Sequence, residues 1–200
     1  MLFRSENESS SKQEFFNIIY NLYNILIFGV SLVLILGSEY IARLLLSKDF
    51  FLAWSWIPWL VLGFYSNAIS SFIGTEFTAA KKTYWILLTT LVSAIVNVFL
   101  NSILIPSYNG LGAAVATLIS YFVLLEIRVF ALNKKFDLAI NNVKVIAEHA
   151  LLIASVIVSI NTSLMWKITC LVIVLIIFTF LNKKYIVYFI HTIPQKTSFR

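Results

Sequence analysis

The fold is set by one stretch of the chain, Asn97-Val-Phe-Leu-Asn101-Ser-Ile-Leu-Ile-Pro106-Ser-Tyr-Asn-Gly110-Leu-Gly112-Ala-Ala-Val-Ala116-Thr117. An apolar segment with two asparagines four residues apart runs into a proline, and a second apolar segment opens just after a glycine. Proline interrupts helices and glycine favours turns, so we expect a five-residue link, 106–110, between two helices. The stretch therefore predicts a helical hairpin.

Small residues open the second helix of this hairpin. Gly112 and Ala116 are four residues apart, as are Ala113 and Thr117, so each pair lies on one helix face. In lipid this spacing lets two helix backbones approach closely, because packing rather than water expulsion drives helix association. We predict a helix-packing motif made of Pro106, Gly110, Gly112, Ala113, Ala114, Ala116 and Thr117.

Composition places the chain in a membrane. Of its 200 residues, 60% are hydrophobic and 12% are charged, against about 45–50% and about 25% in soluble domains. The net charge of +6 is therefore better explained by the positive-inside rule than by nucleic-acid binding. Cys170 is the only cysteine, which leaves no internal disulfide and no cysteine metal cluster. We expect neither a metal nor a cofactor.

Six apolar segments follow a polar start at 1–16. Each is near the roughly 20 residues that a helix needs to cross the hydrocarbon core, and none alternates as a barrel strand would. The sequence thus predicts an all-α integral membrane protein with six transmembrane helices in a bundle. The segments are Asn17–Leu36, Trp54–Gly74, Tyr84–Ile105, Leu111–Ala131, Val143–Ile160 and Leu164–Leu181.

The distribution of basic residues predicts the orientation. Segments on the same side as the N-terminus carry twelve of the 15 Lys and Arg residues, whereas the opposite side carries three. The positive-inside rule therefore places both termini in the cytoplasm. Six crossings also require the two ends to share a side, so the charge count and the segment count agree.

The hairpin also resembles a known family. The pattern Asn97-x-x-x-Asn101-x-x-Leu-Ile-Pro106, followed by Gly110-x-Gly-Ala-Ala-x-Ala-Thr, is similar to the C-terminal half of bacterial polysaccharide (O-antigen or capsule repeat-unit) flippases. These belong to the multidrug/oligosaccharidyl-lipid/polysaccharide exporter superfamily. The resemblance covers about residues 15–135 and includes the segment from Glu39 to Phe50.

This resemblance divides the chain. It implies a four-helix region at 17–135, two further transmembrane helices at 136–181 and a basic cytoplasmic tail at 182–200. Such flippases move an undecaprenyl-pyrophosphate-linked oligosaccharide between the leaflets of the bacterial inner membrane, using two lobes that alternate in access. The resemblance implies transport rather than catalysis. It also implies that this chain is part of one lobe, completed by a missing N-terminal lobe or a second copy.

Asparagines form stripes on two predicted helices. Asn21 and Asn24 belong to a stripe on the first, and Asn97 and Asn101 to a stripe on the third. By resemblance, these four residues are candidates for lining a substrate cavity. They equally suit a second interpretation, in which polar side chains hydrogen-bond neighbouring helices together.

A few ionisable residues lie within the predicted spans. Glu148 and His149 are adjacent and could relay a proton, which makes them candidates for ion coupling. Arg128 and Lys167 lie toward helix ends, where we expect their side chains to snorkel to the interface. Glu39 and Arg43 are four residues apart, so we expect them to pair with each other.

Two other functions fit the same pattern. One is a cation-coupled multidrug exporter of the same superfamily, although the first three predicted helices carry no acidic residue at mid-membrane depth. The other is a non-transporting membrane protein, either a packing partner or the remnant of a split transporter. Nothing in the sequence has the spacing of a catalytic set or a phosphate-cradling loop.

Overall fold

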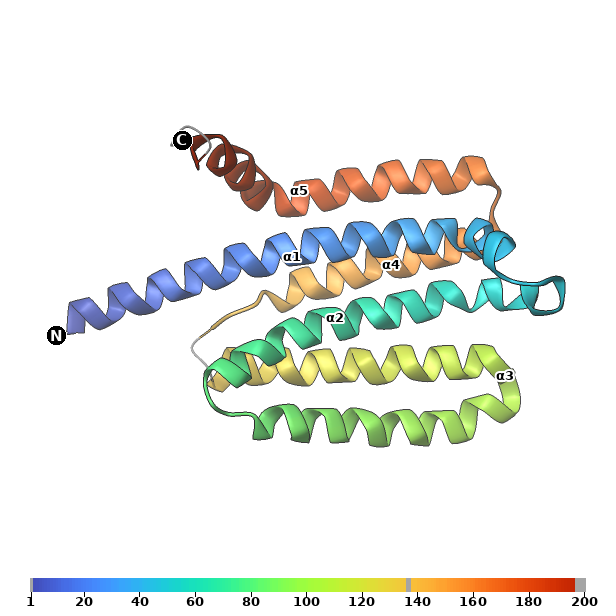
Figure 1. The fold of residues 1–200 in the computed structure, drawn as a ribbon, viewed down its shortest axis with the longest axis horizontal. Coiled ribbons are helices and arrows are strands. Elements are labelled where there is room, and N and C mark those ends of the chain that lie inside the picture. Colours follow the sequence, from blue (N-terminus) through green and yellow to red (C-terminus); the bar gives the residue numbers. More distant parts are fainter. Residues whose placement is uncertain (1, 136–137, 197–200) are drawn as a thin grey trace.

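The computed structural model describes residues 2–135 and 138–196, with side chains described for 11–135 and 138–187. No described residue lies in a β-strand. The helices run side by side along one axis, and α1 begins at the end of the bundle where α5 ends (Figure 1). They are α1 (Leu2–Leu45), the 3-10 helix η1 (Lys48–Ser55), α2 (Ile57–Ala79), α3 (Tyr84–Lys135), α4 (Asn142–Asn161) and α5 (Leu164–Lys196).

The predicted hairpin is the fold of α3. Figure 1 shows α3 doubled back on itself, with two antiparallel halves. The helix is interrupted at Asn109, whose φ of 51° and ψ of −129° are non-helical, while Pro106 lies inside the helix. The turn is therefore shorter than the five-residue link expected from the sequence. It is tight because Gly112 has no Cβ: one placed there would lie 2.3 Å from the carbonyl oxygen of Leu104.

Among the described residues, five helices are long and apolar enough to cross a membrane: α2, α3, α4, residues Ser11–Leu45 of α1 and Leu164–Val187 of α5. A straight helix of 52 residues, the length of α3, would be about 78 Å long, far more than a bilayer needs. Folded in two, α3 supplies two runs of bilayer length. The described part of the chain therefore contains four long apolar helices and the two halves of α3, which agrees with the six segments expected from hydropathy.

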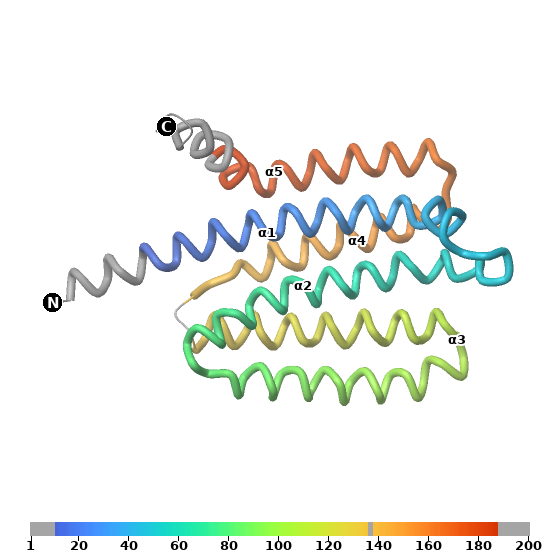
Figure 2. The backbone as a smooth tube through the Cα atoms, viewed as in Figure 1, coloured from blue at the N-terminus to red at the C-terminus, as the bar shows by residue number. Residues whose placement is uncertain are grey.

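The helices divide into two groups around α1 and α2, which pack against each other. Figure 2 traces the path: the α3 hairpin lies against α2, whereas α4 and α5 lie against α1. Apolar side chains fill the space between them; for example, the rings of Phe28 and Phe178 stack 3.8 Å apart between α1 and α5. Leu62 on α2 and Leu125 on α3 are fully buried in this core.

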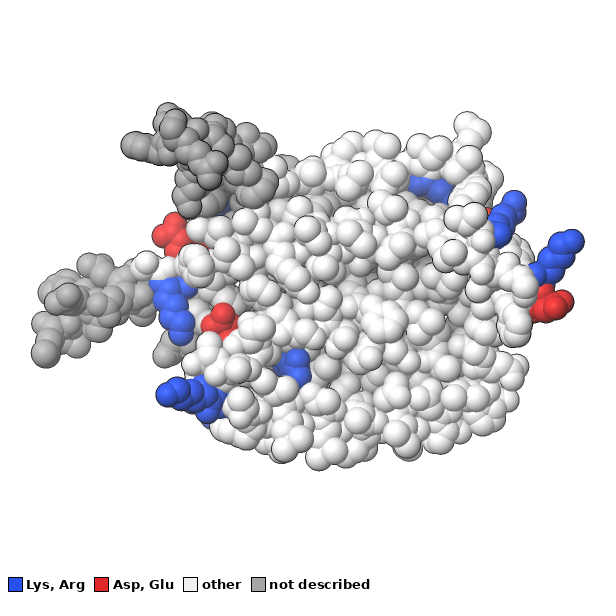
Figure 3. Space-filling view, in the orientation of Figure 1, with Lys and Arg blue, Asp and Glu red and all other residues white. Residues whose placement is uncertain are grey.

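Charged side chains gather toward the two ends of the bundle, and the middle of the face in Figure 3 is mostly uncharged. At one end, Arg43 donates a hydrogen bond of 2.6 Å to Glu39, as the sequence predicted. Lys167 donates to the other oxygen of the Glu39 carboxylate at 2.9 Å. Lys167 is only 3% exposed, so the expectation that it snorkels to the interface was wrong: a carboxylate from α1 neutralises it inside the bundle.

The turn of α3 gives a stability prediction with a matched control. Gly112→Ala places a methyl group against the backbone at Leu104, and such overpacking costs about 1–3 kcal/mol. A Cβ at Gly29 in α1 meets nothing within 4 Å, so Gly29→Ala should be neutral or stabilise by up to about 1 kcal/mol. Thermal unfolding in one mild detergent compares the two. Equal midpoints would show that the turn is not tightly packed.

Candidate functional site

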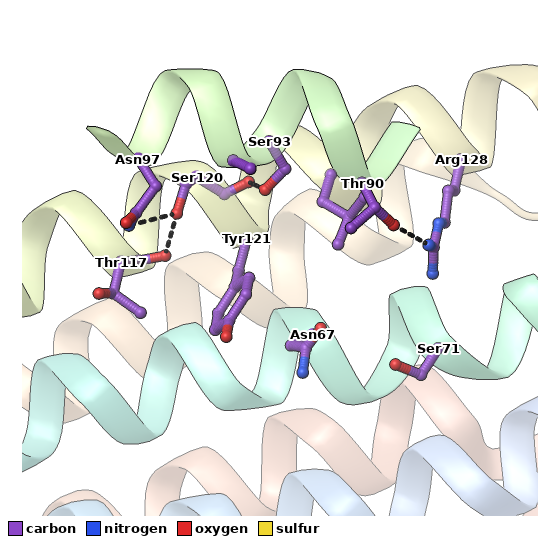
Figure 4. Close-up of a pocket in the computed structure, with 11 residues that line it drawn as sticks. Asn67, Ser71, Thr90, Ser93, Asn97, Thr117, Ser120, Tyr121 and Arg128 are labelled. Atoms are coloured by element: carbon purple, nitrogen blue, oxygen red, sulfur yellow. Dashed lines mark hydrogen bonds between the residues drawn. The ribbon is translucent and has the colours of Figure 1, made fainter. Parts of the chain in front are cut away.

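A polar groove of about 470 Å³ lies between α2 and the two halves of α3. Its volume falls in the roughly 300–1,000 Å³ range of ligand pockets. Most of the lining side chains end in an amide, a hydroxyl or a guanidinium, and none of the lining residues that the structure describes is acidic. The groove is lined by Asn67, Ser71, Thr90, Ser93, Ala94, Asn97, Thr117, Ser120, Tyr121, Leu124 and Arg128, most of which are labelled in Figure 4.

Polar residues line the groove because they are spaced four apart on the helices that form its walls. Asn67 and Ser71 are four residues apart on α2, and Ser93 and Asn97 are four apart on the first half of α3, so each pair lies on one face. Short side chains hold the two halves of α3 together. Ser93 donates to the backbone oxygen of Ser120 at 2.7 Å, and Asn97 donates to the Ser120 hydroxyl at 3.1 Å.

Arg128 closes one end of the groove. Its Nη1 donates to the backbone oxygen of Ser70 on α2 at 2.8 Å. Its Nε and Nη2 donate to the hydroxyls of Thr89 and Thr90 on the first half of α3, each at 3.1 Å. Arg128 is 5% exposed, so the expectation that it snorkels was wrong: hydroxyl and carbonyl acceptors from two other helical runs draw the guanidinium inward.

The two asparagines predicted on the third span lie together. Asn97 lines the groove, and Asn101 donates to the side-chain oxygen of Asn97 at 2.9 Å. The side-chain oxygen of Asn101 is buried and has no hydrogen-bond partner. Asn97 thus binds a neighbouring run of helix, as the packing interpretation expects, and it also faces a polar space, so its role in lining a substrate cavity stays a prediction.

Asn21 and Asn24 are not brought to the groove. They belong to a buried network between α1, α2, α4 and α5. Asn24 donates to Glu148 at 2.8 Å, and Asn21 accepts a hydrogen bond from Lys144. Lys144 also donates to Asn182 on α5 at 2.7 Å and lies 3.9 Å from the Glu148 carboxylate. In this structure the two asparagines join α1 to α4.

Glu148 and His149 face different partners. The hydroxyl of Tyr65 donates to Asn24 at 2.8 Å and lies 3.2 Å from the Glu148 carboxylate. The Nδ1 of His149 lies 2.8 Å from the carbonyl of Val145, which can only accept, so Nδ1 carries a proton. The Nε2 is 2.9 Å from the Ser66 hydroxyl. The Tyr65 ring lies 5.0 Å from the His149 ring, so Tyr65 contacts both Glu148 and His149.

The helix-packing motif is buried on two faces of the second half of α3, with Gly112 and Ala116 on one face and Ala114 on the opposite one. Gly112, Ala114 and Ala116 are buried, while Ala113 and Thr117 are half-buried and Thr117 faces the groove. Gly110 packs against the Trp56 ring, where a Cβ would lie 2.2 Å from the nearest ring atom.

Sequence reasoning missed several lining residues. On α2, Asn67 and Ser71 face the groove, whereas the adjacent Ser66 and Ser70, which have the same spacing, are buried inside the bundle. The spacing signal was the same for both pairs, so hydropathy alone could not choose the face. Tyr121 was also missed, since an aromatic residue near mid-helix usually marks an apolar core.

Comparisons of this chain with protein-family models, with curated proteins and with solved structures found no match.

Proposed function

We propose that this chain is a membrane-embedded part of a polysaccharide repeat-unit flippase in the bacterial inner membrane. Its polar groove would shelter the sugar headgroup of an undecaprenyl-pyrophosphate-linked oligosaccharide. The observation that carries this proposal is the groove itself. Polar side chains from α2 and α3 come together there, within a bundle of long apolar helices.

The lining suits a sugar. Among the described residues, the side chains of Asn67, Ser71 and Tyr121 line the groove and have no hydrogen-bond partner in the protein. Amides and hydroxyls both donate and accept, as sugar hydroxyls do, and an aromatic ring offers an apolar surface. Polar groups without partners are costly at membrane depth, so a polar ligand or water would stabilise this face.

The groove also supports the expected partner. Ser71, Thr90 and Ala94 are exposed, so the groove opens at the surface of this chain. In alternating access a site lies between two bodies that move against each other. We propose that the open side faces a separate N-terminal lobe or a second copy of this chain.

Glu148 and His149 keep the coupling role in this proposal. They lie where α2 packs against α4, since Tyr65 and Ser66 contact them side by side. Gain of a proton by either group would change the hydrogen bonds that hold α2, which forms one wall of the groove.

The proposed orientation places both termini in the cytoplasm. A cysteine at Ser107, beside the turn of α3, should then react with an impermeant thiol reagent added outside, and one at Lys134 should not. Both positions are exposed, and both variants would carry Cys170→Ser. Labelling of Lys134→Cys alone would show that the chain has the opposite orientation in the membrane.

Changing the gene in its own host tests the function and needs no assumption about the partner. Deletion should lower surface polysaccharide and cause undecaprenyl-linked repeat units to accumulate. A multidrug exporter would instead alter drug susceptibility and leave the polymer intact. Unchanged polymer together with unchanged susceptibility would favour the non-transporting alternative and contradict the proposal.

A further inference from the structure

We infer that the Arg128 end of the polar groove binds a phosphate-type oxyanion. The inference concerns a site in this chain and holds whichever molecule the protein transports. Its first support comes from comparing the charge partners of the basic side chains that are not exposed. Among the described side chains, three basic residues are not exposed, namely Arg128, Lys144 and Lys167.

Two of these three cations have an acidic partner. Lys167 lies 2.9 Å from Glu39, and Lys144 lies 3.9 Å from Glu148. Arg128 has no ion pair with any described carboxylate; its three hydrogen bonds go to two hydroxyls and one backbone carbonyl. Neutral acceptors satisfy donors but leave the charge, and an uncompensated buried charge is strongly destabilising. The site thus lacks one negative charge.

The guanidinium also has donors to spare. It carries five N–H groups, and the described part of the protein accepts three of them. The two that remain are one on Nη1 and one on Nη2. Two donors in a planar fork suit the oxygens of a phosphate or carboxylate.

The surroundings favour a ligand on the groove side. A Cβ on Gly74 would lie 3.2 Å from Nη1 of Arg128, so the guanidinium packs closely on the backbone of α2. Arg128 also lines the groove, together with Asn67 and Ser71 on α2, whose side chains are free to donate. Figure 4 shows the Arg128 side chain pointing toward α2, with both of these residues on the facing wall.

The Arg128 site lies toward one end of α3. Arg128 lies seven residues before Lys135, where α3 ends, which is about 10 Å along the helix. A phosphate could therefore arrive free from solution or as the headgroup of an anionic lipid. Both sources present the same chemistry, tetrahedral oxygens with negative charge, and the experiment separates them.

Two binding measurements on the purified full chain in mild detergent test the site. In the first, inorganic phosphate replaces chloride at constant ionic strength, and the midpoint of thermal unfolding is recorded. In the second, native mass spectrometry counts phosphatidylglycerol molecules that remain bound. The variants are Arg128→Gln, Arg128→Lys and Lys134→Gln, the last being an exposed cation near the same end of α3.

We expect the unmodified chain and Lys134→Gln to bind in at least one measurement, and Arg128→Gln to bind about tenfold more weakly or not at all. Loss of phosphate-dependent stabilisation in Arg128→Gln would identify a free anion as the ligand, and loss of bound phosphatidylglycerol would identify a lipid. If Arg128→Gln does not fold, Arg128→Lys decides, because one ammonium cannot replace the two-nitrogen fork and should bind several-fold more weakly. Absence of binding by the unmodified chain, or equal binding by the folded Arg128 variants, would overturn the inference.

Discussion

Replacing Glu148 with Gln should lower the free energy of unfolding by about 3 kcal/mol, the lower end of the cost of breaking a buried ion pair. Glu148 is 1% exposed. Its carboxylate accepts a hydrogen bond from Asn24 at 2.8 Å, and the Tyr65 hydroxyl lies 3.2 Å from the same oxygen. Its other oxygen faces Asn182 at 3.4 Å and Lys144 at 3.9 Å. An amide would point its NH₂ at one of these donor pairs and would leave Lys144 without its anion.

Thermal unfolding in mild detergent measures this loss. By the scaling of soluble domains of similar size, about 3 kcal/mol corresponds to a drop of roughly 6–12 °C in the midpoint. Glu126→Gln is the matched control, because the Glu126 side chain is half-buried on α3 and has no hydrogen bond or ion pair with the described residues. A drop of the same size in both variants would show that the network around Glu148 adds no specific stability.

The second large effect concerns transport. Ala94 lines the polar groove and Ile95 follows it on the exposed apolar side of α3, where it is 61% exposed. Ala94→Trp should fill the groove and reduce surface polysaccharide to the level of the deletion strain. Ile95→Trp places the same ring toward lipid, where tryptophan is tolerated, and should leave export intact.

Protein levels in the membrane must be equal for this comparison. Because the two positions are adjacent, they lie at nearly the same depth, about 1.5 Å apart along the helix. A difference between them therefore reports the face of the helix and not its depth. Normal export by a stably produced Ala94→Trp variant would show that the groove is not the route of the substrate.

The hairpin and the number of helical runs could be predicted from sequence because they depend on local patterns. Hydropathy marked the apolar segments, and Asn97 to Thr117 carried the signal of a turn between two helices. The pair of Glu39 and Arg43 was predictable for the same reason, since residues four apart on a helix are neighbours wherever the helix packs.

The position of Arg128 could not be predicted, because it depends on contacts between helices. Near a helix end, an arginine can extend along its own helix to water or across to a neighbour, and the sequence does not say which acceptors lie beside it. Here the folded hairpin brings Thr89 and Thr90 within reach, and α2 offers the carbonyl of Ser70. The rotation of α2, which turns Asn67 toward the groove, was hidden for the same reason.

The boundaries of α1 also exceeded the apolar segment. The span expected at Asn17–Leu36 lies within a helix that runs from Leu2 to Leu45. Hydropathy measures the part that can lie in lipid, whereas the helix continues through polar residues on either side of that part. The ion pair between Glu39 and Lys167 lies in one such extension and joins α1 to α5.

The measurement that tests the central claim most directly is the access of water to the polar groove at membrane depth. In a Cys170→Ser background, Ala94→Cys and Ile95→Cys would be treated with a water-soluble maleimide in native membranes. Thiols react as thiolates, which form in water and not in lipid. The groove predicts fast labelling at Ala94 and slow labelling at Ile95, although both positions are exposed on the surface of this chain. Labelling of Ile95→Cys as fast as Ala94→Cys, or no labelling at Ala94, would contradict the account.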